Sequence, residues 1–183
     1  MDRKQLLEKI IAREAGMFIA VKASEPADCQ EMLKTFYLMR EMSHSVLAAD
    51  TLTSYLQDLE TAAAAGRNLM TEKYARMENL IPSLNENELI YKIVDIERKW
   101  LSEVHKKYPL TIAVEGGFTT YAVCELETYS DATLNLYYRD IFLAATQKRN
   151  LVEERYQYLY GNLGFKDLEE VEALAQKRAA VKE

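Results

Sequence analysis

The sequence predicts an all-α fold, and three observations support this prediction. Apolar residues recur every three or four positions along most of the 183 residues, which is the period of an amphipathic helix. Only 3 prolines and 6 glycines interrupt the chain, so long elements are expected. No segment alternates apolar and polar residues as a half-buried strand does. We therefore expect residues 1–183 to form one compact domain, a bundle of about six to nine helices.

The first two helices are separated by a short polar segment. The first is predicted over residues 2–23 from its apolar periodicity. The second is predicted over about residues 28–46, because Asp28 and Glu31 have the spacing of a capping box. The candidate core positions of this second helix are Met32, Phe36, Met39 and Val46.

Two more helices complete the first half of the chain. Asp50 is a candidate N-cap for the third helix, which is expected to end after the alanines at 62–65, where Gly66 follows. The fourth helix is predicted over residues 67–79, and Pro82 prevents it from extending further.

A long helix and a long loop follow. Ser83 and Glu86 have capping-box spacing, so we expect the helix to begin there and to end before Tyr108. The segment 109–118 is the longest candidate loop, and its apolar residues 112–114 could form a short isolated strand.

The last third of the chain is again predicted to be helical. The pattern runs from residue 119 to about 161, with a break expected near Ser130 or Asn150. Asp167 is a candidate cap for a final charged helix at about 167–181.

Composition excludes several classes of function. The net charge of −6 argues against a broad nucleic-acid interface, which requires clustered cations. No apolar run approaches the roughly 20 residues that span a bilayer. The two cysteines, Cys29 and Cys124, lack the spacing of a zinc site and are expected to be free thiols. We expect a soluble, cytoplasmic protein that binds neither nucleic acid nor membrane, and the composition does not predict its oligomeric state.

A first polar motif lies in the fourth predicted helix. Glu72 and Arg76 are four residues apart and can pair on one helix face, while Lys73 and Met77 share the adjacent face and Tyr74 lies between them. One interpretation is an exposed ion pair beside a core contact. The other is a ligand-binding surface.

A second motif places a carboxylate between two phenols. Tyr121, Glu125 and Tyr129 recur every four residues and therefore share one side of a helix. Partial burial among aromatic rings predicts a raised pKa for Glu125, as a general acid or base requires. The alternative is a tyrosine stripe packed on a neighbouring helix, with Glu125 bonded to an arginine.

These two stretches resemble the paired motifs of the bacterial and archaeal domain-of-unknown-function family 4125. The first family motif, Glu-Lys-Tyr-Ala-Arg-Met, is matched in full by residues 72–77. The second, Glu-Thr-Tyr-Leu-Arg-Gly-Glu-Leu, is matched at Thr120, Tyr121, Glu125 and Leu126, whereas Thr119, Val123 and Cys124 replace its glutamate, arginine and glycine. The likeness extends over about residues 5–165 and identifies a divergent member. It implies a shared site but no particular reaction.

The leading hypothesis is a small-molecule site, or an enzyme, inside the bundle, with an anionic ligand as its partner. The predicted ligand-binding residues are Arg76, Tyr74, Arg40, Glu72 and Lys73. The predicted catalytic residues are Glu125 as acid or base, with Tyr121 and Tyr129 orienting the substrate. No cofactor and no metal ligand are assigned.

Three other classes of function are alternatives to a small-molecule site. A non-enzymatic interaction or regulatory domain could use methionine-rich surface or the charged last helix. A di-iron bundle needs two Glu-x-x-His motifs, and Glu41 with His44 supplies one. An α-helical nuclease with an Arg-x(4 to 6)-His motif is disfavoured, because only three residues separate Arg40 from His44.

Overall fold

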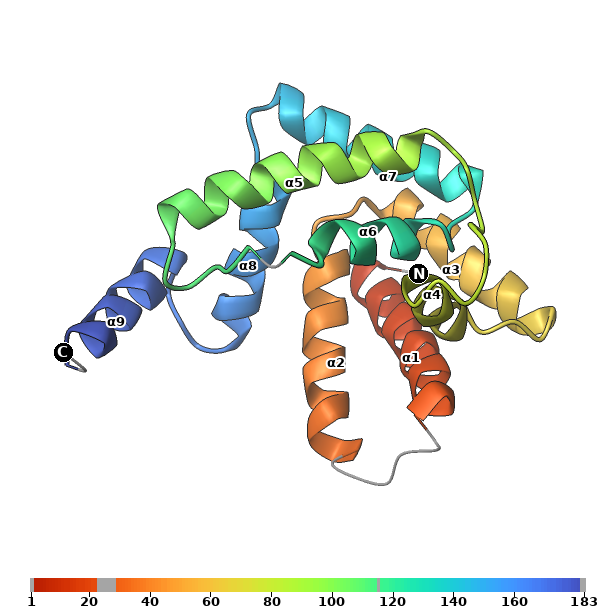
Figure 1. Cartoon of the computed structure of the whole chain (residues 1–183), viewed down its shortest axis with the longest axis horizontal. Helices are drawn as coiled ribbons and strands as arrows, with labels where there is room; N and C mark the ends of the chain where they lie inside the picture. Colours follow the sequence, from red (N-terminus) through yellow and green to blue (C-terminus); the bar gives the residue numbers. More distant parts are fainter. Residues whose placement is uncertain (1, 23–28, 115, 182–183) are drawn as a thin grey trace.

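The described part of the chain is entirely helical. The computed structural model describes residues 2–22, 29–114 and 116–181, and these contain nine α-helices and no strand (Figure 1). The helices are α1 (Arg3–Lys22), α2 (Cys29–His44), α3 (Ala49–Ala64), α4 (Leu69–Met77), α5 (Leu89–Lys107), α6 (Phe118–Leu126), α7 (Asp131–Thr146), α8 (Leu151–Asn162) and α9 (Leu168–Ala180). The all-α prediction is confirmed.

The helices form two connected groups. α1 packs against α2, α3 and α4, while α5 packs against α6, α7 and α8. Further contacts between α2 and α8, α3 and α7, and α4 and α6 join the groups, and α9 packs on α8 at the end of the molecule (Figure 1). None of the helices in the described ranges is long and apolar enough to cross a membrane.

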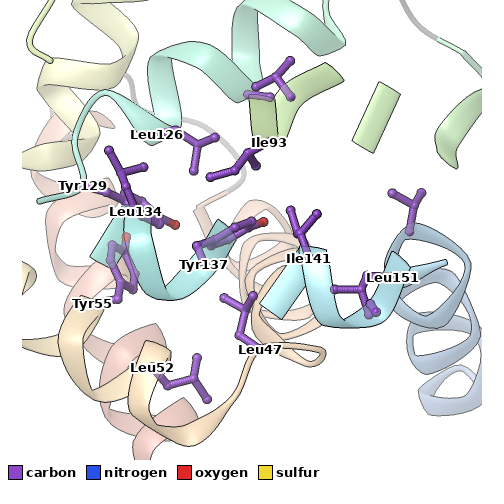
Figure 2. Close-up of a cluster of buried hydrophobic side chains, with 14 of the residues drawn as sticks. Leu47, Leu52, Tyr55, Ile93, Leu126, Tyr129, Leu134, Tyr137, Ile141 and Leu151 are labelled. Atoms are coloured by element: carbon purple, nitrogen blue, oxygen red, sulfur yellow. The ribbon is translucent and has the colours of Figure 1, made fainter. Parts of the chain in front are cut away.

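One cluster of buried apolar side chains runs through both groups. It extends from Leu6 in α1 to Leu168 at the start of α9. Figure 2 shows Tyr55, Tyr129 and Tyr137 inside this cluster among leucine and isoleucine side chains. Buried phenols carry hydroxyl groups that need polar partners, so these three tyrosines bring polar atoms into the core.

One break is expected after residue 119, near Ser130 or Asn150; the helix breaks at both positions, and each new helix has a side-chain cap. The Ser130 hydroxyl accepts a hydrogen bond from Thr133 N at the start of α7, and the Asn150 carbonyl caps α8. The predicted cap Asp167 accepts from Glu170 N at 2.9 Å and begins α9. These local signals predict the helix starts correctly because each cap bonds within its own turn.

Two other predicted caps are wrong. Asp50 lies in the first turn of α3 instead of at its N-cap, and its carboxylate accepts two hydrogen bonds from Arg139. Ser83 does not start α5, because its hydroxyl donates to a loop carbonyl; the side chain of Asn87 accepts from Leu89 N and precedes the helix instead. In both places a nearby polar group binds the side chain that was expected to cap the helix.

The candidate core of the second helix is partly corrected. Phe36 stacks on Phe18 with ring centroids 4.5 Å apart, and Val46 packs against the core. Met39, however, is 42% exposed. The capping box at Asp28 and Glu31 and the side chain of Met32 lie outside the described residues.

The predicted loop between α5 and α6 holds the last helix. Ile112 is fully buried in it, and its carbonyl oxygen is 2.6 Å from Nδ1 of His105. No strand forms in the described part of this loop. Thr111 donates to the buried carboxylate of Glu172 at 2.6 Å, and Tyr108 donates to Glu169 at 2.6 Å. These contacts fix α9 against the loop.

Candidate functional site

A pocket of about 530 Å³ lies where α2, α5, α6, α7 and α8 meet, and we call it the central pocket. Two groups of charged and polar side chains, most of them buried, contribute to its wall. The first, the Arg40 cluster, consists of Glu14, Arg40, His44, Tyr55, Lys73, Tyr121 and Glu125. The second, the Arg155 cluster, consists of Glu97, Tyr137 and Arg155.

Arg40 is shared between two carboxylates. Its Nε and Nη2 donate to the two oxygens of Glu14 at 2.9 and 2.6 Å, and Nη2 also contacts Glu125 Oε1 at 2.5 Å. Glu14 is completely buried, and only 5% of the Arg40 side chain is exposed. The two-point contact with Glu14 holds the guanidinium plane in one orientation.

Side chains from two further helices, α3 and α4, complete the cluster together with His44 and Tyr121. Tyr55 of α3 donates to Glu14 at 2.7 Å, and His44 Nε2 lies 3.1 Å from the same oxygen. Lys73 of α4 donates to Glu125 Oε2 at 2.8 Å and to the hydroxyl of Tyr121 at 3.2 Å. The cluster therefore links α1, α2, α3, α4 and α6.

Positive charges beside the two carboxylates of this cluster decide their ionisation. Burial by itself raises the pKa of Glu125, but the positive charges of Arg40 and Lys73 outweigh burial and bring that pKa to about 2. The pKa of Glu14 is likewise far below its usual range, since Arg40 and His44 outweigh its burial. The predicted rise in the pKa of Glu125 is therefore wrong, because cations from two other helices contact it.

This result changes what Glu125 can do chemically. A carboxyl group with a pKa of about 2 is ionised at neutral pH, so it has no proton to donate as a general acid. It is also a weak proton acceptor. Glu125 is instead suited to accept hydrogen bonds and to keep Arg40 and Lys73 in place.

The Arg155 cluster is smaller and less completely bonded. Nη2 of Arg155 forms an ion pair with Glu97 Oε1 at 2.8 Å and donates to the Tyr137 hydroxyl at 2.6 Å, and Tyr137 donates to Glu97 at 2.9 Å. Among the described residues, Nε of Arg155 is buried without any hydrogen-bond partner. A buried donor without a partner is uncommon in folded proteins.

Aromatic rings connect the two clusters. The ring of Tyr55 stacks on that of Tyr129 with centroids 4.4 Å apart, and Tyr129 meets Tyr137 edge-on at 6.3 Å (Figure 2). His44 lies 5.2 Å from Tyr55 at the other end of this series. Tyr129 and Tyr137 both line the central pocket.

The structure brings together most of the predicted site residues but separates two of them. Arg40, Lys73, Tyr121, Glu125 and Tyr129 converge on one region. The ring of Tyr74 lies beside this region, with its centroid 5.0 Å from Lys73 Nζ. The exceptions, Arg76 and Glu72, lie away from the pocket wall.

Arg76 and Glu72 have other partners. Arg76 Nε donates to Glu127 at 2.8 Å, and Glu72 accepts two hydrogen bonds from Arg67. The expected pairing between Glu72 and Arg76 is therefore not seen. The two motifs do meet, through Lys73 with Glu125 and through Arg76 with Glu127.

Sequence reasoning missed Glu14, Tyr55, Glu97, Tyr137 and Arg155. A usable signal existed for the three charged ones, because each interrupts an apolar helix stripe. Apolar residues occur three and four positions before each of them and four positions after: Ile10, Ile11 and Phe18 around Glu14; Ile93, Val94 and Leu101 around Glu97; Leu151, Val152 and Leu159 around Arg155. A charge at such a position faces the core and must find a partner.

The side chains do not assemble the di-iron alternative. Glu41 accepts a hydrogen bond from Tyr158, whereas His44 contacts Glu14. Over the described ranges, no group of three or more His, Cys, Asp or Glu side chains is arranged to hold a metal ion.

The comparisons with known proteins agree with the motifs. The model of the family described as "Protein of unknown function (DUF4125)" matches residues 4–173, which is nearly the whole chain. Searches of curated proteins and of solved structures found no match. The earlier resemblance is thereby confirmed, and the chain belongs to the DUF4125 family.

Proposed function

We propose that this protein binds a small organic ligand with an anionic group in the central pocket. The observation that carries the proposal is the lining of the pocket, in which buried charged groups face a space of about 530 Å³ between otherwise apolar walls. Ligand sites typically have volumes of roughly 300–1,000 Å³ and combine apolar walls with a few placed polar groups. The central pocket fits this description.

The apolar part of the wall favours an organic ligand. Met39 and Met42 from α2, Met77 from α4 and Phe118 from α6 all line the pocket. Methionine side chains are flexible and polarisable, so they adapt to ligands of differing shape. A purely ionic ligand would gain little from these contacts.

The Arg40 cluster would hold one part of the wall rigid. Tyr121 is 39% exposed and lies within reach of both Arg40 and Lys73, so its hydroxyl would contact a bound ligand. Tyr129 would contribute a second hydroxyl. Catalysis by Glu125, Tyr121 and Tyr129 stays a prediction, and the proposal concerns binding.

Methionine methyl groups provide a test that reports from inside the pocket. Full-length protein with ¹³C-labelled methionine methyls would be screened by NMR against a library of small organic acids and neutral aromatic compounds. We expect hits to shift the methyl signals of Met39, Met42 and Met77. The signal of Met70, which is buried elsewhere, should stay in place. A library that leaves all three pocket signals unchanged would contradict the proposal.

Two neighbouring glycines allow a matched pair of variants. Gly117 lines the pocket and Gly116 does not, and a Cβ added at either position meets no atom within 4 Å. Gly117→Phe should therefore weaken ligand binding by on the order of tenfold, as expected when pocket volume is lost. Gly116→Phe should bind as the wild type does. Equal effects of the two variants would place the ligand elsewhere.

A further inference from the structure

We infer that Arg155 is the anchor for the acidic group of the ligand, which makes the ligand a compact organic acid with an apolar body. The inference rests on the proposed function and assigns the anionic group to a residue that neither family motif contains. Arg76, the arginine expected from the motifs, is bonded to Glu127 and does not line the pocket.

The first argument is that the guanidinium group of Arg155 has a hydrogen-bond donor without a partner among the described residues. A guanidinium group carries five N–H donors. The hydrogen bond of Arg155 to Tyr137 and its ion pair with Glu97 both use Nη2, and Nε has no partner among the described residues. Arg40, by contrast, donates from Nε, Nη1 and Nη2. Of the two arginines that line the pocket in the described residues, Arg155 is the one with a nitrogen, Nε, that has no hydrogen-bond partner.

The second argument is the number of carboxylates at each arginine. Arg40 contacts two carboxylates, Glu14 and Glu125, whereas Arg155 contacts one among the described residues, Glu97. The Arg40 cluster shows that an arginine in this wall can hold two carboxylates at once. A ligand carboxylate beside Arg155 would create the same arrangement.

The third argument concerns the environment of Arg155. Its side chain is only 11% exposed, and it faces the pocket. Charge-assisted hydrogen bonds are stronger where water is largely excluded. Tyr129 also lines the pocket, and its hydroxyl has no hydrogen bond to another of the described residues, so it supplies a neutral donor for the same ligand.

The apolar surfaces near Arg155 define the rest of the ligand. Leu101 and Val152, which flank the Arg155 cluster along α5 and α8, line the pocket together with Phe118. An acid with an aromatic or branched aliphatic body would bury that body against these side chains. Inorganic anions would leave the apolar walls uncovered.

Benzoate and benzamide test this assignment, because they share one ring and differ in charge. Their affinities would be measured by calorimetry with full-length wild type, Glu97→Gln and the double variant Glu97→Gln/Arg155→Met. The methionine methyl signals would confirm that each compound occupies the pocket. The double variant removes both charges together, so no buried charge is left unpaired.

We expect the wild type to prefer benzoate over benzamide by on the order of tenfold, the size of one charge-assisted hydrogen bond. Glu97→Gln should increase this preference about tenfold further, because it removes the carboxylate that competes for Arg155. The double variant should bind the two compounds equally, with benzamide near its wild-type affinity.

The failures of the two proposals can be told apart. If both compounds shift the pocket methyl signals but the wild type shows no preference, or if the preference persists in the double variant, Arg155 is not the anchor and the pocket proposal stands. If neither compound reaches the pocket of any variant, both the pocket proposal and this inference are overturned.

Discussion

The Arg40 cluster and the Arg155 cluster place similar chemistry on the wall of one pocket, but they differ in how completely their groups are bonded. Arg40 lies among two carboxylates, a histidine and a tyrosine hydroxyl, with Lys73 balancing the charge. Arg155 has one carboxylate and one phenol, and its Nε has no partner among the described residues. A buried charge therefore does not by itself mark a ligand site, and the two clusters differ in whether every nitrogen of the arginine is bonded.

The clusters also differ in the number of helices that they connect. The Arg40 cluster joins α1, α2, α3, α4 and α6, whereas the Arg155 cluster joins α5, α7 and α8. Removing one member of a buried ion pair is strongly destabilising, because the partner charge remains buried. We therefore propose that the Arg40 cluster has a mainly structural role and the Arg155 cluster a mainly ligand-binding role.

The largest expected effect comes from Glu14→Gln. The substitution removes a completely buried carboxylate and leaves Arg40 and Lys73 with Glu125 as their shared anion. We expect the free energy of unfolding to fall by about 3–5 kcal/mol, as found when buried pairs are broken. Urea denaturation followed by circular dichroism measures this change.

Glu97→Gln is the matched change in the other cluster. Arg155 faces the pocket, where water or an added anion can reach it. We expect a smaller loss of about 1–3 kcal/mol, and we expect benzoate to restore stability to Glu97→Gln but not to Glu14→Gln. If both variants lost the same free energy of unfolding and benzoate stabilised neither, the two clusters would not differ in their role.

The next prediction concerns the loss of stability of the folded protein at acidic pH. The folded-state pKa of Glu125 is about 2, below its usual value of 4.5, so its contribution is complete above about pH 4.5 and is lost as the pH falls through 2. A difference of this size corresponds to about 3 kcal/mol. The free energy of unfolding should therefore fall more steeply below pH 4.5 in the wild type than in Glu125→Gln.

The exposed residue Glu88 provides the control for this prediction, since 87% of its side chain is exposed. Denaturant unfolding of Glu88→Gln at a series of pH values should give a profile parallel to that of the wild type. A Glu125→Gln profile as steep as the wild-type profile would mean that Arg40 and Lys73 do not stabilise the ionised carboxylate.

The sequence predicts the fold well because helix signals are local. Apolar periodicity and the caps at Ser130, Asn150 and Asp167 depend on residues within one or two turns. The predictions failed at Asp50 and Ser83, where another polar group binds the side chain. Arg139 binds Asp50 from α7, 89 residues away, and periodicity cannot show such a contact.

The candidate site is only partly predictable for the same reason. The motifs led to Lys73, Tyr121 and Glu125, which do converge. The partners of Arg40 lie 26 and 85 residues away in the sequence, at Glu14 and Glu125, so their contacts depend on the tertiary fold. The direction of the Glu125 pKa shift was predicted wrongly because these partners were not known.

The last comparison concerns two tyrosines whose rings stack on each other, and it contains the smallest expected change in stability, at Tyr129. The Tyr55 hydroxyl donates to the buried carboxylate of Glu14 at 2.7 Å, whereas that of Tyr129 makes no hydrogen bond within the described residues and lines the pocket. Tyr55→Phe should lower the free energy of unfolding by about 1.5–3 kcal/mol, as expected for a hydrogen bond to a charged group.

Tyr129→Phe keeps the ring stack and removes a hydroxyl for which the described residues offer no hydrogen bond. We expect it to change the free energy of unfolding by less than about 0.5 kcal/mol and to weaken benzoate binding about threefold to tenfold, the size of one neutral hydrogen bond. Tyr55→Phe should have the opposite pattern, with lower stability and unchanged binding by the folded protein. If Tyr129→Phe destabilised the protein as much as Tyr55→Phe does, its hydroxyl would be part of the structural network, and the distinction between bonded and unused polar groups would fail at this position.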